Sequence, residues 1–196
     1  GAAGPLSVLE LFHGPTAAFK DFGARFLAAS LERIPRTDPR RLTILVATSG
    51  DTGGAVAAAF YQRPWVDVVV LYPQGLVSAR QEKQLACWGG NVRTLAVAGT
   101  FDDCQDLAKA CFNDLAFRDR HALTAVNSIN FARVMAQIVY YFWAALKLGA
   151  PDRPVAFTVP SGNFGNVYAG YAARQMGLPV SHFVVGANSN DILARF

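Results

Sequence analysis

The chain has 196 residues, of which 52% are hydrophobic and 16% charged, so it can bury a core as one large or two small domains. Its net charge of +4 comes mostly from scattered basic residues without interleaved aromatics, which argues against a nucleic-acid surface. The longest apolar stretch, residues 131–150, contains charged and polar residues and falls short of the roughly 20 apolar residues of a membrane span. We therefore predict neither a membrane helix nor a signal peptide.

The first notable segment, residues 10–23, places Lys20 between Phe19 and Phe22. Burial among apolar groups disfavours the ammonium form of a lysine, and the neutral amine is the form that attacks a carbonyl to make a Schiff base. We therefore predict that Lys20 binds pyridoxal phosphate covalently. On residue type alone, the alternative is a snorkelling lysine at a helix start. The other lysines have charge partners or a helix end beside them: Lys83, Lys109 and Lys147.

Apolar runs alternate with helical periodicity along nearly the whole chain, which is typical of an α/β protein with parallel sheets. The predicted strands are nearly continuously hydrophobic, so we expect them to be buried on both faces. They are Leu42–Ala47, Val66–Leu71, Val92–Val97, Val155–Val159 and His182–Gly186. The predicted helices are Phe22–Ile34, Gly54–Tyr61, Ala79–Trp88, Phe101–Asn113, Phe131–Leu148 and Gly165–Met176. Two helix starts carry capping-box patterns, Ser78 with Gln81 and Thr100 with Asp103.

The three cysteines, Cys87, Cys104 and Cys111, show no C-x-x-C spacing, and no motif predicts a metal site. Cys104 and Cys111 lie seven residues apart and so share one face of a predicted helix. Unpaired thiols favour a reducing, cytosolic setting.

Two glycine-rich loops each follow a predicted strand and open a helix. Residues 159–166 (Val-Pro-Ser-Gly-Asn-Phe-Gly-Asn) would direct backbone N–H groups and a positive helix end at an anion, so we predict a phosphate site there. A plain strand-to-helix turn is the alternative. Residues 47–54 (Ala-Thr-Ser-Gly-Asp-Thr-Gly-Gly) could hold a second anion such as a substrate carboxylate, and ordinary capping by Ser49 or Asp51 is the alternative there.

Four segments occur in an order and spacing that closely resemble the threonine synthase family, within the tryptophan-synthase-β-like group of pyridoxal-phosphate enzymes. They are the Lys20 segment, Ser49–Gly53, Asn127–Asn130 and Ser161–Asn166, and residues 81–85 and 99–103 also look like this family. The resemblance implies a three-layer, parallel-sheet α/β fold. Residues 1–41 and 118–196 would be pieces of a large cofactor-binding domain, and residues 42–117 a smaller βαβα subdomain.

The same resemblance implies roles for individual residues. Lys20 would be the covalent cofactor lysine and proton shuttle. Further cofactor contacts would come from Asp51, Gly162, Asn163, Phe164, Gly165 and Asn166. The amino-acid carboxylate would be bound by Ser49, Gly50 and Thr52. The phosphate of O-phospho-L-homoserine would be bound by Asn127, Ser128, Asn130 and Arg133.

Three of these positions carry further arguments. Arg133 suits a phosphate independently, because its guanidinium falls in the first turn of an apolar helix; a helix-start arginine that reaches solvent is the alternative. Asp51 is interpreted as a helix cap first and a cofactor contact second, because an ionised carboxylate would repel a phenolate or a substrate carboxylate. His13 stays unassigned, and we expect a loop histidine bonded to backbone.

We accordingly expect a cytoplasmic enzyme that converts O-phospho-L-homoserine and water to L-threonine and phosphate, with neither nucleic-acid nor membrane partners. The alternatives are a related pyridoxal-phosphate lyase, such as a serine/threonine dehydratase, and a non-catalytic fragment or binding protein of the same fold. The resemblance also implies that the family's N-terminal cap and the late hydroxyl residue that meets the pyridine nitrogen are missing. We therefore expect a central fragment with little activity by itself.

Overall fold

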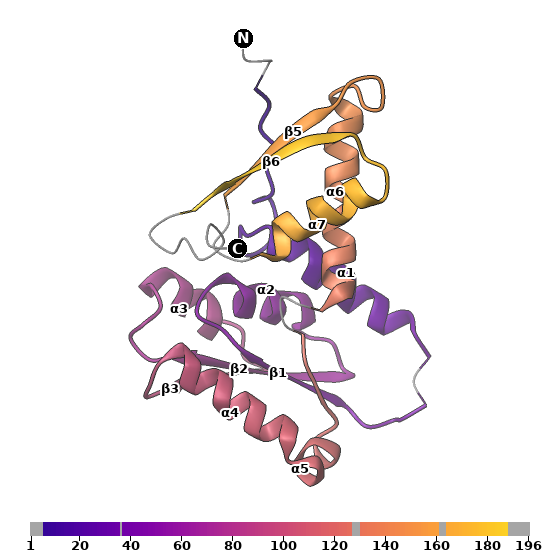
Figure 1. The fold of residues 1–196 in the computed structure, drawn as a ribbon. Helices are drawn as coiled ribbons and strands as arrows, with labels where there is room; N and C mark the ends of the chain where they lie inside the picture. Colours follow the sequence, from indigo (N-terminus) through magenta and orange to yellow (C-terminus); the bar gives the residue numbers. More distant parts are fainter. Residues whose placement is uncertain (1–5, 36, 127–129, 161–163, 188–196) are drawn as a thin grey trace. The chain divides into compact units, whose positions relative to one another are not determined.

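The computed structural model describes residues 6–35, 37–126, 130–160 and 164–187 (Figure 1). The chain divides into two compact units, one formed by residues 1–10 and 131–196 and the other by residues 11–130. Each unit contains a parallel sheet of its own.

The unit of residues 11–130 is built on a four-stranded parallel sheet with the strand order β3-β2-β1-β4. The strands are β1 (Leu42–Ala47), β2 (Val66–Pro73), β3 (Val92–Val97) and β4 (Leu123–Thr124). In the register, Leu42 pairs with Val66 and Val68 pairs with Val92. The first three strands agree closely with the prediction. The two-residue β4 was not predicted, because its apolar run is too short to be recognised as a strand.

Helices cover both faces of this sheet (Figure 1). They are α1 (Lys20–Arg33), α2 (Asp51–Phe60), α3 (Ala79–Ala86), α4 (Phe101–Asn113) and α5 (Leu115–Arg120). Helix α2 packs on β2 and α4 packs on β1 and β2 from the opposite face, while α1 packs against α2. The result is the α/β layering expected of buried parallel strands. Helix α5, which continues almost directly from α4, was not predicted.

The strands differ in how deeply they are buried. Ile44, Leu45 and Val46 are consecutive buried residues, which confirms burial on both faces for β1. In β3 the expectation is wrong, because Leu95 is 52% exposed. The physical reason is position: β3 ends the strand order of the described sheet, so fewer elements cover it than cover β1.

Both predicted capping boxes are confirmed. Ser78 accepts a hydrogen bond from the N–H of Gln81 at the start of α3, and Thr100 accepts one from the N–H of Asp103 at the start of α4. In each box the side chain of the third helical residue accepts a hydrogen bond from the N–H of the cap residue. The Thr100 N–H and hydroxyl hold the pKa of the Asp103 carboxyl below its usual value.

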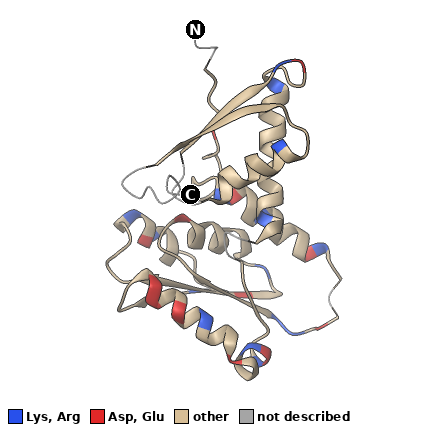
Figure 2. Ribbon diagram, viewed as in Figure 1, with Lys and Arg blue, Asp and Glu red and all other residues tan. Residues whose placement is uncertain are grey.

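Two arginines in the loop before β1, Arg40 and Arg41, form ion pairs within the unit of residues 11–130. Arg40 forms ion pairs with Asp38 (2.7 Å) and Asp119 (3.4 Å), and Arg41 pairs with Asp67 (2.8 Å). Figure 2 shows that lysines and arginines elsewhere are distributed over several elements of both units. Arg40 and Arg41 therefore link this loop to α5 and β2.

The other unit contains α6 (Phe131–Lys147), β5 (Val155–Pro160), α7 (Gly165–Gln175) and β6 (Val180–Gly186). Strands β5 and β6 pair in parallel, and α6 packs against α7. All four elements were predicted to within a few residues. Burial on both faces does not hold here either, since Val184 in β6 is 47% exposed in a sheet of two described strands.

The predicted smaller subdomain, residues 42–117, lies entirely inside the unit of residues 11–130. That unit is larger because α1 packs on α2 and β4 adds to the sheet beside β1. The assignment of residues 42–117 to a smaller subdomain, and of the flanking residues to a large cofactor-binding domain, stays a prediction.

Two further observations concern the cysteine of α4 and the length of the helices. Cys104 is buried on α4, and burial raises the pKa of its thiol, which keeps it in the unreactive protonated form. Within the described residues, no helix has the length and apolar character needed to cross a membrane.

Gly53 should be intolerant of a side chain, because a Cβ there would lie 2.4 Å from Thr48 Cγ2 and 2.9 Å from side-chain atoms of Leu85 and Val70. We expect Gly53→Ala to lower the free energy of unfolding by about 1–3 kcal/mol. Gly54→Ala is the matched control, since a Cβ there meets nothing nearer than 3.9 Å, and it should be neutral or stabilising by about 0.5–1 kcal/mol. Urea unfolding of both variants measures the difference, and equal effects would contradict the packing argument.

Candidate functional site

The predicted site residues that the structure describes fall into two groups, one in each unit. Lys20, Ser49, Gly50, Asp51, Thr52 and Asn130 lie in the unit of residues 11–130, and Arg133, Phe164, Gly165 and Asn166 lie in the other. Asn127, Ser128, Gly162 and Asn163 lie outside the described residues.

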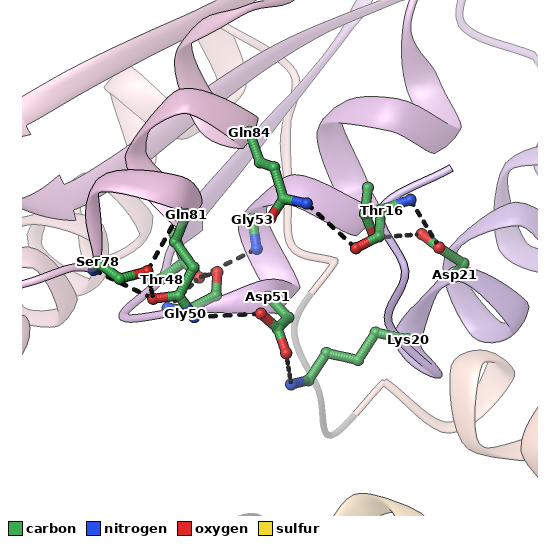
Figure 3. Close-up of polar contacts among 10 residues, drawn as sticks. All are labelled: Thr16, Lys20, Asp21, Thr48, Gly50, Asp51, Gly53, Ser78, Gln81 and Gln84. Atoms are coloured by element: carbon green, nitrogen blue, oxygen red, sulfur yellow. Dashed lines mark hydrogen bonds and ion pairs between the residues drawn. The ribbon is translucent and has the colours of Figure 1, made fainter. Parts of the chain in front are cut away.

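The turn from β1 into α2 is organised by Thr48, which is 2% exposed. Its hydroxyl oxygen accepts hydrogen bonds from the N–H groups of Gly50 (3.2 Å) and Gly53 (3.0 Å), and the hydroxyl donates to the carbonyl of Gly50 (2.9 Å) (Figure 3). One side chain therefore satisfies the N–H of the third helical residue, the task usually carried out by the cap residue itself. Sequence reasoning missed Thr48 because it precedes the cap position by two residues.

Asp51 is not the cap that we expected. Gly50 occupies the cap position of α2, and Asp51 is the first helical residue. Its Oδ1 accepts a hydrogen bond from Gln81 Nε2 at 3.2 Å, and its Oδ2 lies 4.0 Å from Lys20 Nζ (Figure 3). Thr48 already binds the N–H of Gly53, so the Asp51 carboxylate is available to the site. Its role as a cofactor contact stays a prediction.

The flanking turn residues offer different surfaces. Ser49 is exposed, whereas Gly50 and Thr52 are half-buried. A Cβ at Gly50 would lie 3.2 Å from Gln81 Nε2, so a side chain at this position would press on α3. The glycine thus allows α3 to lie close to the turn.

Lys20 is the first residue of α1, and its side chain is 17% exposed. The ammonium lies 5.2 Å from the centroid of the Phe19 ring, which is within range of a cation–π contact. Phe22, the other predicted neighbour, is 42% exposed. The Lys20 side chain is therefore largely buried, as expected, although Phe22 is itself exposed. The carboxylate of Asp51 was not anticipated, and it favours the ammonium form.

The start of α1 is fixed by a buried carboxylate. Asp21, which is 1% exposed, accepts hydrogen bonds from the N–H (2.9 Å) and hydroxyl (2.7 Å) of Thr16 (Figure 3). A Cβ at Gly14 would come within 2.3 Å of the same carboxylate. Ala17 in this turn adopts a left-handed φ of 55°, which costs an alanine on the order of 1–2 kcal/mol. The Asp21–Thr16 bonds hold this turn, and hence Lys20, in place.

Gln84, on α3 like Gln81, reaches the segment before α1. Its Nε2 donates to the carbonyl of Thr16 at 3.4 Å (Figure 3). Gln81 thus contacts the start of α2, and Gln84 contacts the segment before α1. Nothing in the sequence pairs them with residues so far along the chain, so neither glutamine had a predicted role at the site.

Arg133 lies in the first turn of α6 and is 1% exposed, so the solvent-reaching alternative is wrong. Among the described contacts, its Nε and Nη1 have no hydrogen-bond partner, and burial lowers the pKa of the guanidinium to about 10. A shift from 12.5 corresponds to about 3 kcal/mol against the charged form. A buried cation with orphaned donors is suited to an anion, and an oxyanion with several acceptors fits it well.

Asn166, in the first turn of α7, is held by two tyrosines of α6. Tyr140 donates to its Oδ1 at 2.5 Å, and the Tyr141 hydroxyl lies 3.0 Å from its backbone carbonyl and 3.2 Å from Oδ1. Burial raises the pKa of both hydroxyls, so they stay protonated and donate. These bonds fix the side-chain amide of Asn166, whose N–H groups are the donors that could serve an anion.

The N-terminus of α7 receives no hydrogen bond from the side chain of its cap residue, because that residue is Phe164. Gly165 is the first helical residue after it. A helix start whose cap residue offers no side-chain acceptor is compatible with the predicted phosphate contact. That contact stays a prediction, since part of the loop lies outside the described residues.

His13 is exposed, and its ring packs on Phe12 at a centroid distance of 4.8 Å. Within the described residues, no cluster of three or more His, Cys, Asp or Glu side chains is placed to hold a metal ion.

A shielded lysine beside a glycine-rich turn of a parallel α/β sheet is typical of enzymes that bind a carbonyl cofactor. Residues 6–196 match the family described as pyridoxal-phosphate-dependent enzyme, and the chain belongs to this family. The predicted fold class is thereby confirmed.

The chain is similar to curated threonine synthases. It is 53% identical to that of Pseudomonas aeruginosa, covering 96% of this chain and 40% of the relative, and 51% identical to that of Escherichia coli, covering 96% and 44%. Among solved structures, pyridoxal-phosphate-bound threonine synthase from Brucella melitensis superposes with a TM-score of 0.86 at 53% identity, over 96% of this chain and 41% of that one. The chain thus spans less than half the length of these relatives.

Arg133→Met should remove a buried charge but keep most of the volume. In phosphate-free buffer we expect an unchanged free energy of unfolding, or an increase of about 1–3 kcal/mol. Inorganic phosphate should stabilise the unsubstituted chain by mass action and stabilise the variant much less. Thermal unfolding with and without phosphate measures this, with Arg174→Ala, an exposed arginine of α7, as the control. Equal phosphate responses in all three proteins would contradict an anion site at Arg133.

Proposed function

We propose that the polypeptide carrying this chain is a threonine synthase, which converts O-phospho-L-homoserine and water to L-threonine and phosphate. The observation that carries this proposal is the identity of about 50% to threonine synthases over nearly all of the chain. By contrast, a tomato threonine deaminase superposes with a TM-score of 0.65 at 17% identity, which supports the shared fold alone.

The cofactor would be pyridoxal 5′-phosphate, and the described residues fit it. Lys20 offers a shielded amine for covalent attachment through a Schiff base, and the start of α7 offers N–H groups for the cofactor phosphate. When bound, this cofactor withdraws electrons from the carbon atoms next to the substrate amine. Phe164, Gly165 and Asn166 would hold its phosphate together with Gly162 and Asn163, and Asp51 would lie beside its attachment point.

The substrate would be held at two anionic ends. Backbone and hydroxyl groups of Ser49, Gly50 and Thr52 would bind the amino-acid carboxylate at the N-terminus of α2, where the helix dipole favours a negative charge. Arg133 would bind the phosphate through the donors that have no partner in the described structure, with Asn127, Ser128 and Asn130 on the segment before it.

Lys20 would then carry the proton transfers. Its amine would remove protons at Cα and Cβ as phosphate leaves from Cγ. A proton added at Cγ would complete the methyl group, and water would add its hydroxyl at Cβ while a proton returns to Cα. Asp51, 4.0 Å from Nζ, would stabilise the protonated form of the lysine between these transfers. Thr48 and Asp21 would not contact the substrate. Thr48 would hold the β1–α2 turn in position, and Asp21 would hold the segment before α1.

The unpaired cysteines support a reducing setting for this reaction. A small phosphorylated amino acid and a cofactor are the binding partners, in threonine biosynthesis in the cytoplasm. Nucleic acid and membrane have no part in this reaction.

Lys20 should be the residue to which the cofactor is attached. After addition of pyridoxal phosphate, borohydride reduction makes the attachment permanent, and peptide mapping locates it. We expect the label on Lys20, because it is 17% exposed, whereas Lys109 is 66% exposed and pairs with Asp106. Lys20→Arg, which keeps the charge, should abolish the labelled peptide. Label chiefly on Lys83, Lys109 or Lys147 would refute the assignment.

A further inference from the structure

Gln81 connects three parts of the unit of residues 11–130. It lies in the first turn of α3, and its side chain reaches both its own cap residue, Ser78, and Asp51 on α2 (Figure 3). It also lies against the glycine turn, since a Cβ at Gly50 would come within 3.2 Å of its Nε2. Gln81 therefore acts on the site from a separate helix.

The orientation of the Gln81 amide is fixed by its neighbours. Oε1 accepts hydrogen bonds from the N–H (3.3 Å) and the hydroxyl (2.9 Å) of Ser78. A backbone N–H can only donate, so the end of the amide that faces Ser78 must be the oxygen. The NH₂ end must then face Asp51, which accepts from it at 3.2 Å.

This contact selects how Asp51 is turned. Oδ1 is bound to Gln81, and Oδ2 is the oxygen that lies 4.0 Å from Lys20 Nζ. The Asp51 side chain is 46% exposed, so without a second contact water would compete for both of its oxygens. The amide of Gln81 supplies that second contact.

We propose that Gln81 is a positioning residue that holds the Asp51 carboxylate toward Lys20 and so sets how strongly the lysine retains its proton. The inference rests on the proposed function in one respect, namely that Lys20 is the reacting amine. It gives a second task to a residue whose capping role alone would explain its presence in α3.

Asp103 separates these two tasks. It occupies the same third helical position in the capping box of α4, where it binds the N–H and hydroxyl of its own cap residue, Thr100. Asp103→Ala therefore removes a comparable cap without touching Asp51. In Gln81→Ala the residue-81 N–H still bonds to Ser78 Oγ and alanine favours helix, so this variant should fold.

The test is competitive acylation of lysines with acetic anhydride in the full polypeptide that carries this chain, purified without cofactor and read by peptide mass spectrometry. Lys83, Lys109 and Lys147 serve as internal references. Asp51→Asn removes the carboxylate charge and should raise the relative acylation of Lys20 by about two- to fivefold, the range expected for a partly exposed ion pair. Gln81→Ala acts through Asp51, so it should raise the acylation of Lys20 by about twofold and by no more than Asp51→Asn does, and Asp103→Ala should leave it unchanged.

Three results would overturn the proposal. An unchanged Lys20 in Gln81→Ala, with a response in Asp51→Asn, would make Gln81 a helix cap alone. No response in Asp51→Asn would mean that the carboxylate has no hold on the amine. A response in Asp103→Ala equal to that of Gln81→Ala would indicate general loosening. Because no cofactor is present, failure of the proposed enzymatic function would not alter these outcomes.

Discussion

The turn between β1 and α2 is the constraint on which the rest of the site depends. The Thr48 hydroxyl binds two N–H groups of the turn, and Gly53 allows α2 to approach Val70 and Leu85 more closely than any side chain would permit. That close approach sets the distance between α2 and the sheet. Because α1 packs on α2, the position of α2 also determines where Lys20 meets Asp51.

The site combines two opposing electrostatic demands. A lysine that attacks a carbonyl must lose its proton, and a lysine that transfers protons must regain one. Shielding at 17% exposure favours the neutral amine, whereas a carboxylate at 4.0 Å favours the ammonium. Arg133, in the other unit, is a buried cation whose Nε and Nη1 have no hydrogen-bond partner among the described contacts, so we predict that a bound anion offsets the cost of its burial.

Much of the fold and part of the site could be predicted from the sequence, for local reasons. Hydrophobic runs located five of the six described strands, and the spacing of Ser78 and Gln81 identified a capping box that the structure contains. What the sequence could not show depends on contacts between distant residues. Gln81 meets Asp51 from 30 positions away, and Gln84 meets Thr16 from 68. The capping role of Thr48 was missed for a different reason, because the cap and its partner are local but do not follow the usual spacing.

Lys20, at the start of α1 and beside this turn, is the residue proposed to perform the chemistry of a threonine synthase. The most direct measurement is release of inorganic phosphate from O-phospho-L-homoserine by the full polypeptide that carries these 196 residues, with pyridoxal phosphate supplied. We expect release with threonine as the co-product, and its loss by at least about a thousandfold in Lys20→Ala, as for removal of a group that acts as both nucleophile and base. Turnover that survives in Lys20→Ala, or phosphate release without threonine, would contradict the account.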